Sequence, residues 1–174
     1  MKFSRYVRVG LVCGLVVALG LTLSGCSSSG FGNSAFGSTN AKIAELPADA
    51  AVTPAVALAQ GRGHFVSNDF GYSAAYFKKA VELAPNNPEG YVGLGASYDR
   101  LGRFDLADRV YAALLKLRGP SVQYYNNIGY SMMLRGDLKS ALSYFHKAEA
   151  LDPHNIIVAN NIQLLTDAAA RAGA

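Results

Sequence analysis

The sequence predicts an all-α fold, a solenoid of three helix-turn-helix repeats closed by a C-terminal capping helix. The first observation is a period of 34 residues, because segments beginning at Pro54, Pro88, Val122 and Ile156 align without a gap. The second is the residue type in the aligned columns. In the three full repeats the eighth position is glycine, the twentieth is small and the twenty-fourth is aromatic. The third is that turn-forming residues cluster between the expected helices.

These columns have a physical reason. One pair of helices cannot bury its apolar face alone, so neighbouring pairs must stack on one another. Two helices approach closely only where their side chains are small, and an aromatic ring then fills the remaining space. We therefore expect the following residues to form the packing between helices: Gly61, Gly95, Gly129, Ala107 and Ala141 as the small residues, and Phe77, Tyr111 and Phe145 as the aromatic residues.

The period and these columns resemble the tetratricopeptide repeat, TPR. The match is clearest over residues 95–107, which have the sequence GASYDRLGRFDLA. The resemblance implies a TPR domain over residues 54–172 that binds other proteins. Its repeats would span residues 54–87, 88–121 and 122–155, and its cap would span residues 156–172.

Residues 1–25 have the pattern of a lipoprotein signal peptide. Three basic residues precede an uncharged run at 9–23, whose 15 residues are too few for a helix that spans a hydrocarbon core of roughly 30 Å. The run ends in Leu-Ser-Gly-Cys, which resembles the bacterial lipobox. The resemblance implies cleavage before Cys26, its lipidation, and, with Ser27 next, a periplasm-facing anchor in the outer membrane. The alternatives are an uncleaved signal, or ordinary cleavage near a chance cysteine.

Residues 26–53 are expected to form the lipidated cysteine and a flexible tether. Ser, Gly and Asn dominate its first part, and no helical or strand period is visible there. Phe31 and Phe36 are unusual in a passive tether; they either make incidental contacts or form a short recognition element. The low-charge stretch around Pro47 is compatible with a short helix or a loop.

Composition and residue placement exclude several classes of function. The full chain carries 16 basic and 12 acidic residues, but removal of the signal peptide leaves 13 basic residues, so no electrostatic argument for nucleic acid remains. Cys26 would be the only cysteine after cleavage. His64, His146 and His154 lie in three different repeat contexts, without the i, i+4 spacing of a metal site. We expect no enzyme, no metal and no cofactor.

In the TPR family the first helix of each repeat lines a concave groove. If the same positions line a groove in this protein, its surface is mainly apolar with a few charged residues. Such a surface suits a partner segment that has apolar anchor residues. It lacks the set of Lys and Asn residues found in TPR domains that clamp a terminal carboxylate. The residues expected to line it are Leu58, Arg62, Phe65, Val66, Val92, Asp99, Arg100, Asn126, Tyr130, Met133 and Leu134.

The combination of lipobox, low-complexity tether and compact repeat array resembles the TadD lipoproteins of tight-adherence (Flp) pilus systems and the TPR pilotins of type IV pili. The resemblance implies a membrane-tethered scaffold that binds a secretin or another pilus assembly component. The alternative is a general envelope scaffold that organises outer-membrane protein assembly or peptidoglycan enzymes. An accessory hydrolase is disfavoured, because the sequence carries no acid and base pair at a suitable spacing.

Overall fold

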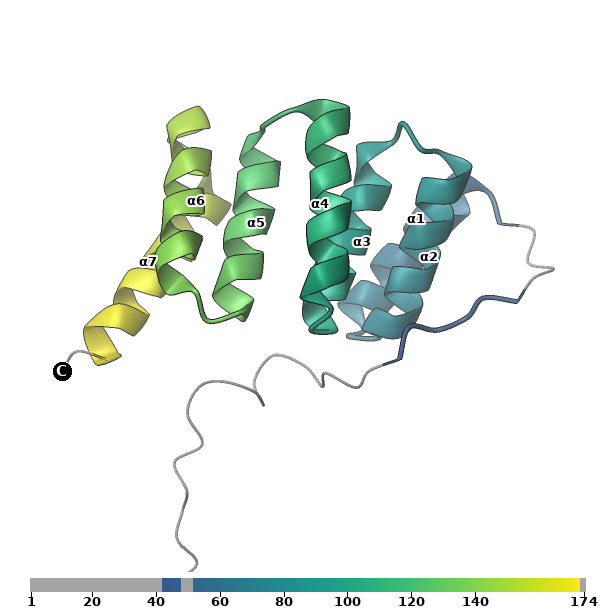
Figure 1. Ribbon diagram of the computed structural model, residues 1–174, viewed down its shortest axis with the longest axis horizontal. Helices are drawn as coiled ribbons and strands as arrows, with labels where there is room; N and C mark the ends of the chain where they lie inside the picture. The colour runs from purple at the N-terminus through teal and green to yellow at the C-terminus, as the bar shows by residue number, and fades with distance from the viewer. Residues whose placement is uncertain (1–41, 48–51, 173–174) are drawn as a thin grey trace, which may run out of the picture.

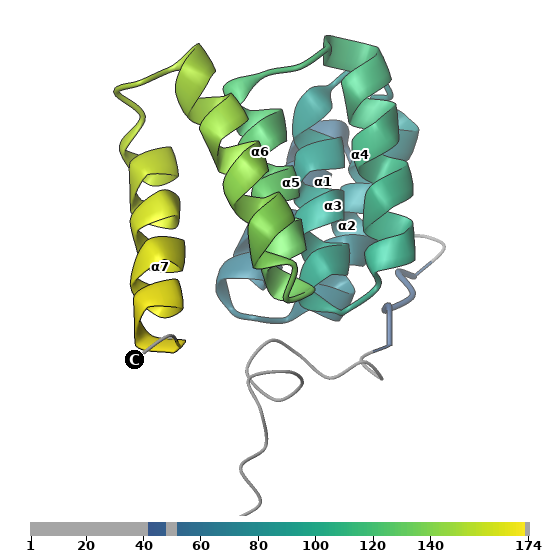
Figure 2. The same cartoon turned by 60° about the vertical axis from the view of Figure 1, so that its left-hand side comes forward.

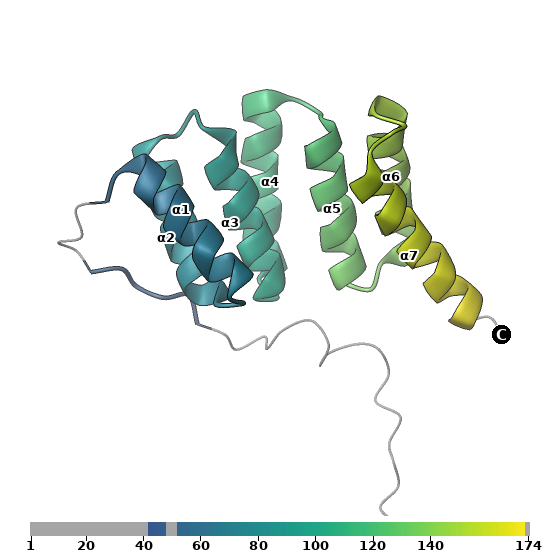
Figure 3. The same cartoon turned by 180° about the vertical axis from the view of Figure 1, so that it is seen from behind.

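The computed structural model of the protein describes residues 42–47 and 52–172. Those residues form an all-α solenoid without strands, as predicted, in which consecutive helices run antiparallel along one row (Figure 1). The helices α1, α3 and α5 form one layer, and α2, α4 and α6 form the other (Figure 3). The seven helices are α1 (Pro54–Val66), α2 (Phe70–Leu83), α3 (Pro88–Arg100), α4 (Phe104–Arg118), α5 (Val122–Leu134), α6 (Leu138–Leu151) and α7 (Ile156–Ala172).

Local sequence signals set the helix ends. The side-chain oxygens of Thr53, Asn87 and Ser121 accept hydrogen bonds from free backbone N–H groups at the starts of α1, α3 and α5. Within each repeat, the first helix ends in a turn whose residue at the fifteenth position has positive φ. This residue is Asn68, Gly102 and Gly136 in the three repeats, and such a conformation favours Gly and Asn. The three repeats therefore share the same internal turn.

The glycine column lets the two helices of each repeat approach closely. A Cβ atom added at Gly61, Gly95 or Gly129 would lie 2.9, 2.5 or 2.6 Å from the aromatic ring at the twenty-fourth position of the same repeat. Ala107 and Ala141, at the twentieth position, are fully buried. The aligned columns are thus the positions where the two helices of a repeat touch. They recur every 34 residues because each repeat makes the same contact between its glycine and its aromatic ring.

Gly95→Ala is expected to lower the free energy of unfolding by about 1–3 kcal/mol, because the added methyl group meets the ring of Tyr111. That ring is buried and its hydroxyl is hydrogen-bonded to Asp99, so it cannot move aside freely. Urea unfolding followed by circular dichroism measures the effect. Gly63→Ala is the matched control: its added methyl meets no atom within 4 Å, and better helix propensity should raise stability by up to about 1 kcal/mol. Equal losses in both variants would contradict the packing argument.

The capping helix α7 packs only through one face. Val158 and Leu165 are buried against Phe145 and neighbouring alanines of α6. Figure 2 shows α7 standing at the open end of the row, inclined to α6. The opposite side carries Ile157 and Leu164, which are mainly exposed.

Part of the predicted tether is held on the domain. The backbone N–H of Ala44 donates to the carbonyl oxygen of Gly71 in α2 at 3.3 Å, and Ile43 and Val52 pack against the core. A Cβ at Gly71 would lie 2.6 Å from the Lys42 carbonyl oxygen, so glycine admits this close approach. Residues 42–47 form a loop rather than a short helix, and they differ from the free linker that the composition suggests.

Other predictions for the N-terminal part lie outside the described residues. These are the signal peptide over residues 1–25, lipidation of Cys26, and the tether up to residue 41. Among the helices of the described ranges, none combines the length and the apolar character that a membrane crossing requires.

Candidate functional site: a groove on the first helices of the repeats

A cavity of about 370 Å³ opens on the layer formed by α1, α3 and α5. Four of the predicted groove residues line it: Arg62, Phe65, Val66 and Val92. Val66 is 82% exposed, and it presents an apolar side chain at the mouth of the cavity. The remaining lining residues are Phe77, Glu89, Gly93, Ala96, Gln123 and Asn127.

The charges at the rim of this cavity compensate each other. The guanidinium of Arg62 on α1 forms an ion pair with the carboxylate of Glu89 on α3. Both side chains are about half exposed, so the pair adds little to stability. Its effect on the site is to leave the groove without net charge.

The C-terminal half of the predicted groove is closed by the cap. Tyr130 and Met133 pack against the cluster that α7 forms with α6. The side-chain oxygen of Asn126 accepts a hydrogen bond from the amide of Asn161 on α7, at 2.8 Å. Leu134 is buried, and so is Leu58 at the opposite end of the row. The cavity is therefore confined to the first two repeats and the start of the third.

The side chain of Arg100 contacts the first repeat instead of the groove. Its guanidinium lies over the ring of Phe70, 4.3 Å from the centroid, and its Nη2 is 3.5 Å from the side-chain oxygen of Asn68. A cation held over an aromatic ring in this way joins the first and second repeats. It does not line the cavity.

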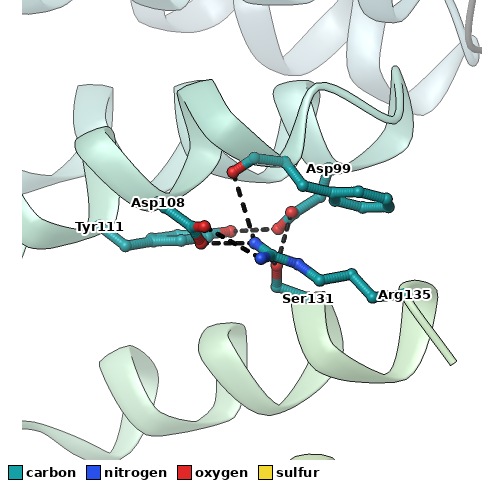
Figure 4. Close-up of polar contacts among 6 residues, drawn as sticks. Asp99, Asp108, Tyr111, Ser131 and Arg135 are labelled. Atoms are coloured by element: carbon teal, nitrogen blue, oxygen red, sulfur yellow. Dashed lines mark hydrogen bonds and ion pairs between the residues drawn. The ribbon is translucent and has the colours of Figure 1, made fainter. Parts of the chain in front are cut away.

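Asp99 corrects the prediction most clearly, because its side chain is only 1% exposed and does not reach the groove. Tyr111 donates its hydroxyl hydrogen bond to Asp99 Oδ2 at 2.9 Å, and Ser131 donates to Oδ1 at 2.6 Å (Figure 4). Ser131 in turn accepts from Arg135 Nη2 at 3.0 Å, and Arg135 pairs with Asp108. This network joins α3, α4 and α5 across the boundary of the second and third repeats.

Burial dominates the electrostatics of this network. It raises the pKa of the Asp99 carboxyl to about 6, although the hydrogen bonds from Ser131 and Tyr111 and the charge of Arg135 act in the opposite direction. Burial, reinforced by the negative charge of Asp99, also raises the pKa of the Tyr111 hydroxyl well above its ordinary value. Asp99 is thus a structural group whose charge the surroundings tolerate poorly.

Sequence reasoning overlooked the floor of the cavity. The ring of Phe77 packs against Gly93, one of two glycines of α3 that fall outside the recurring eighth-position column. A glycine outside that column was the available signal, but its meaning depends on where the Phe77 ring points. Within the described residues, no three His, Cys, Asp or Glu side chains come together as metal ligands.

Residues 58–107 and 92–156 match the family model described as tetratricopeptide repeat, and these ranges cover more than half of the chain. The protein belongs to the tetratricopeptide repeat family. Solved TPR domains share its fold. The first TPR domain of human RPAP3 is 19% identical, with a TM-score of 0.59, covering 68% of this chain and 94% of that domain. The Arabidopsis OM64 TPR domain is 18% identical, with a TM-score of 0.58, covering 66% and 95%.

Curated TPR proteins align over a similar region. The small glutamine-rich tetratricopeptide repeat-containing protein 2 of Mycosarcoma maydis is 24% identical over 100 residues, which is 58% of this chain and 28% of that protein. The Hsp70-Hsp90 organizing protein of Triticum aestivum is 29% identical over 99 residues, 57% of this chain and 17% of that protein. The chain thus spans less than a third of the length of these relatives.

Proposed function

We propose that this TPR protein is a lipid-anchored scaffold that binds a protein partner in the groove on α1, α3 and α5. The observation that carries the proposal is the open cavity between these helices, lined by exposed Val66, by Val92 and by the polar residues Gln123 and Asn127. Concave sites with apolar walls and a few polar groups are where proteins bind ligands. The proposal assigns no catalysis to the chain.

The lipid anchor and the pilus role are the finer part of the proposal. The Leu-Ser-Gly-Cys run supports an acylated Cys26, and the Ser/Gly-rich tether supports display of the domain in the periplasm. Anchoring would raise the concentration of the bound partner near the outer membrane. On this basis the groove binds a secretin or another component of pilus assembly of the tight-adherence type.

Photo-crosslinking at the groove tests the binding site. We expect benzoylphenylalanine at Val66 in the full-length protein, expressed in its own cells, to capture a distinct protein partner. The same group at Lys116, an exposed position on the opposite layer, should not capture it. Equal capture at both positions, or none at Val66, would contradict the groove as the binding site.

The identity of the captured partner distinguishes the pilus role from the general envelope scaffold. A secretin or a pilus assembly protein supports the pilus role. A barrel-assembly component or a peptidoglycan enzyme instead supports the general envelope scaffold, and it would overturn the pilus assignment while leaving the groove intact.

Cys26→Ala is expected to abolish incorporation of labelled palmitate and to move the protein from the membrane fraction to the soluble fraction, because several acyl chains are needed for stable anchoring. Fractionation and palmitate labelling measure the two effects. Cys13→Ala is the matched control and should leave both unchanged, because that cysteine lies inside the uncharged run. Unchanged membrane retention in Cys26→Ala would refute the lipid anchor.

A further inference from the structure

Residues 42–47, here called the strap, lie on a face of α2 that differs from the same face in the later repeats. The strap contacts Gly71, the eighteenth residue of its repeat, and lines a cavity together with Ala75, the twenty-second. The same two positions in the later repeats carry larger, exposed side chains: Asp105 and Arg109 on α4, and Lys139 and Ser143 on α6. Only the first repeat therefore has small residues where another chain segment can approach the helix closely.

The glycine at position 71 serves the strap and not the helix. The φ angle of Gly71 is not positive, so α2 itself does not require glycine there. A Cβ atom at this position would lie 2.6 Å from the carbonyl oxygen of Lys42. Because that oxygen belongs to the backbone, no side-chain rotation can relieve the contact. A larger residue at position 71 would therefore push the strap off the helix.

The attachment of the strap is nevertheless slight. Among the described residues, one hydrogen bond joins it to a helix, from Ala44 to Gly71, and its length of 3.3 Å is greater than is usual for such bonds. Ile43 and Leu46 are only partly buried. A cavity of about 500 Å³ lies between the strap and α2, so the strap covers the helix without filling the space beneath it. Its release should need far less free energy than the unfolding of the helices.

We infer that the strap is releasable and that it sets how far the groove can reach from the membrane anchor. When the strap is docked, the free tether ends at residue 41. When it is released, residues 42–53 join the tether, and their extended length is about 40 Å. The groove cavity and the strap cavity share no lining residue, so release changes the reach and leaves the binding surface unchanged. The inference rests on the proposed function, because reach matters only if the protein is anchored and the groove binds a partner.

Hydrogen exchange of the full-length protein in detergent micelles tests whether the strap docks and opens. The amide of Ala44 should exchange about tenfold to a hundredfold more slowly than in an unfolded chain, because its hydrogen bond exists only in the docked state. Amides in the middle of α3 should be slowed at least about a thousandfold, since they exchange only when the domain unfolds. Protection of Ala44 equal to that of α3, or no protection at all, would overturn the inference.

Gly71→Asp should release the strap, so that the amide of Ala44 exchanges within about twofold of its rate in an unfolded chain. The amides of α1 to α7 should keep their protection. Aspartate suits this position of α2, because the second repeat has Asp105 there and a negative charge is favourable in the first turn of a helix.

Gly63→Asp is the matched control, because its Cβ atom meets nothing within 4 Å, and it should leave Ala44 protected. If Gly71→Asp disturbs α2, Ile43→Ser decides, because this substitution lies on the strap and removes a side chain that packs against the core. Unchanged protection of Ala44 in a folded Gly71→Asp or Ile43→Ser variant would overturn the docking described here.

A shortened tether tests the effect on reach. Deletion of residues 28–39 removes twelve residues and keeps Cys26 and Ser27. We expect the deletion to lower photo-crosslinking from Val66 in cells at least about threefold, because a tether that cannot span the distance to the partner lowers its effective concentration. Gly71→Asp in the shortened protein should restore crosslinking to within about twofold, because release of the strap returns twelve residues to the tether.

The other results of this deletion contradict the inference. No loss of crosslinking would show that reach does not limit binding. A loss that Gly71→Asp does not restore would show that residues 28–39 act through something other than length. Either result overturns the role of the strap in reach.

The outcomes distinguish this inference from the proposed function. If Gly71→Asp releases Ala44 but Val66 captures no partner, the proposed function fails and the role in reach fails with it, while the docking of the strap stands. If Val66 captures a partner but Ala44 is never protected, only the inference fails.

Discussion

Phe145→Ala is expected to lower the free energy of unfolding by about 3–5 kcal/mol, the usual cost of removing a buried aromatic side chain. The ring is 0% exposed, and it lies against Gly129 of α5, Ala141 of α6 and Val158 of α7. It therefore holds the third repeat to the cap as well as to its own first helix. Since domains of this size are stable by roughly 5–15 kcal/mol, the loss should be visible as a large shift in the urea midpoint.

The control for this prediction is Ile156→Ala. Ile156 is a comparably large apolar residue at the start of α7, but it is 73% exposed. Its truncation should change the free energy of unfolding by less than about 0.5 kcal/mol. If both substitutions cost the same, the third repeat and the cap do not share the buried contact described here.

The stability of the wild-type protein should fall by about 3 kcal/mol between about pH 3 and about pH 7 through Asp99 alone. Burial raises the pKa of this carboxyl from 3.8 in the unfolded chain to about 6 in the native fold. Between these values the native state binds more protons than the unfolded state, so a rise in pH favours unfolding. Below about pH 3 the carboxyl is protonated in both states and above about pH 7 it is ionised in both, so Asp99 gives no further pH dependence outside this range.

Asp99→Asn isolates this contribution, because the amide stays neutral at every pH and keeps an oxygen that accepts a hydrogen bond from Tyr111 or Ser131. We expect the difference between the wild-type and variant free energies of unfolding to change by about 3 kcal/mol over this range. Urea titrations at a series of pH values measure it. Asp105→Asn, at an exposed aspartate of α4, should keep the wild-type slope. Parallel curves for wild type and Asp99→Asn would refute the role of burial at this carboxyl.

The Asp99 network also explains why the junction of the second and third repeats carries polar groups. Breaking a buried, hydrogen-bonded charge by removing one partner is more costly than replacing the whole group. Arg135 supports the network from the partly exposed side, through Ser131 and Asp108 and through its position over the ring of Phe104. Through these hydrogen bonds and this ion pair, the network joins α3, α4 and α5.

Much of the groove prediction followed from the repeat register, and its errors have a common cause. The register places Arg62, Phe65, Val66 and Val92 on one face, where they line one cavity, because a helix of known phase presents known positions. It also assigned Asp99 to that face, although this carboxyl turns into the junction to meet Ser131, 32 residues away. The position of a residue along a helix predicts the direction of its side chain. It does not predict whether residues of another helix bury that side chain.

The cap shows the same limit. The sequence identifies α7 as the closing helix, and Gln163 stands where the three full repeats have glycine. Its angle to α6 and the hydrogen bond from Asn161 to Asn126 decide that the third repeat contributes little to the open cavity. Residues 42–47 were likewise unremarkable by composition, because their attachment depends on the close approach that Gly71 allows.

By itself the sequence determined the fold of residues 54–172. Helix caps, turns with positive φ, and the glycine and aromatic columns are local signals that repeat every 34 residues, and each contact lies within one repeat or between neighbours. Only the tertiary structure decided the extent of the groove, the burial of Asp99 and the packing of Gly93 on the Phe77 ring. These features arise where side chains from different repeats are in contact. The 34-residue period does not specify how deeply those side chains are buried or which way they point.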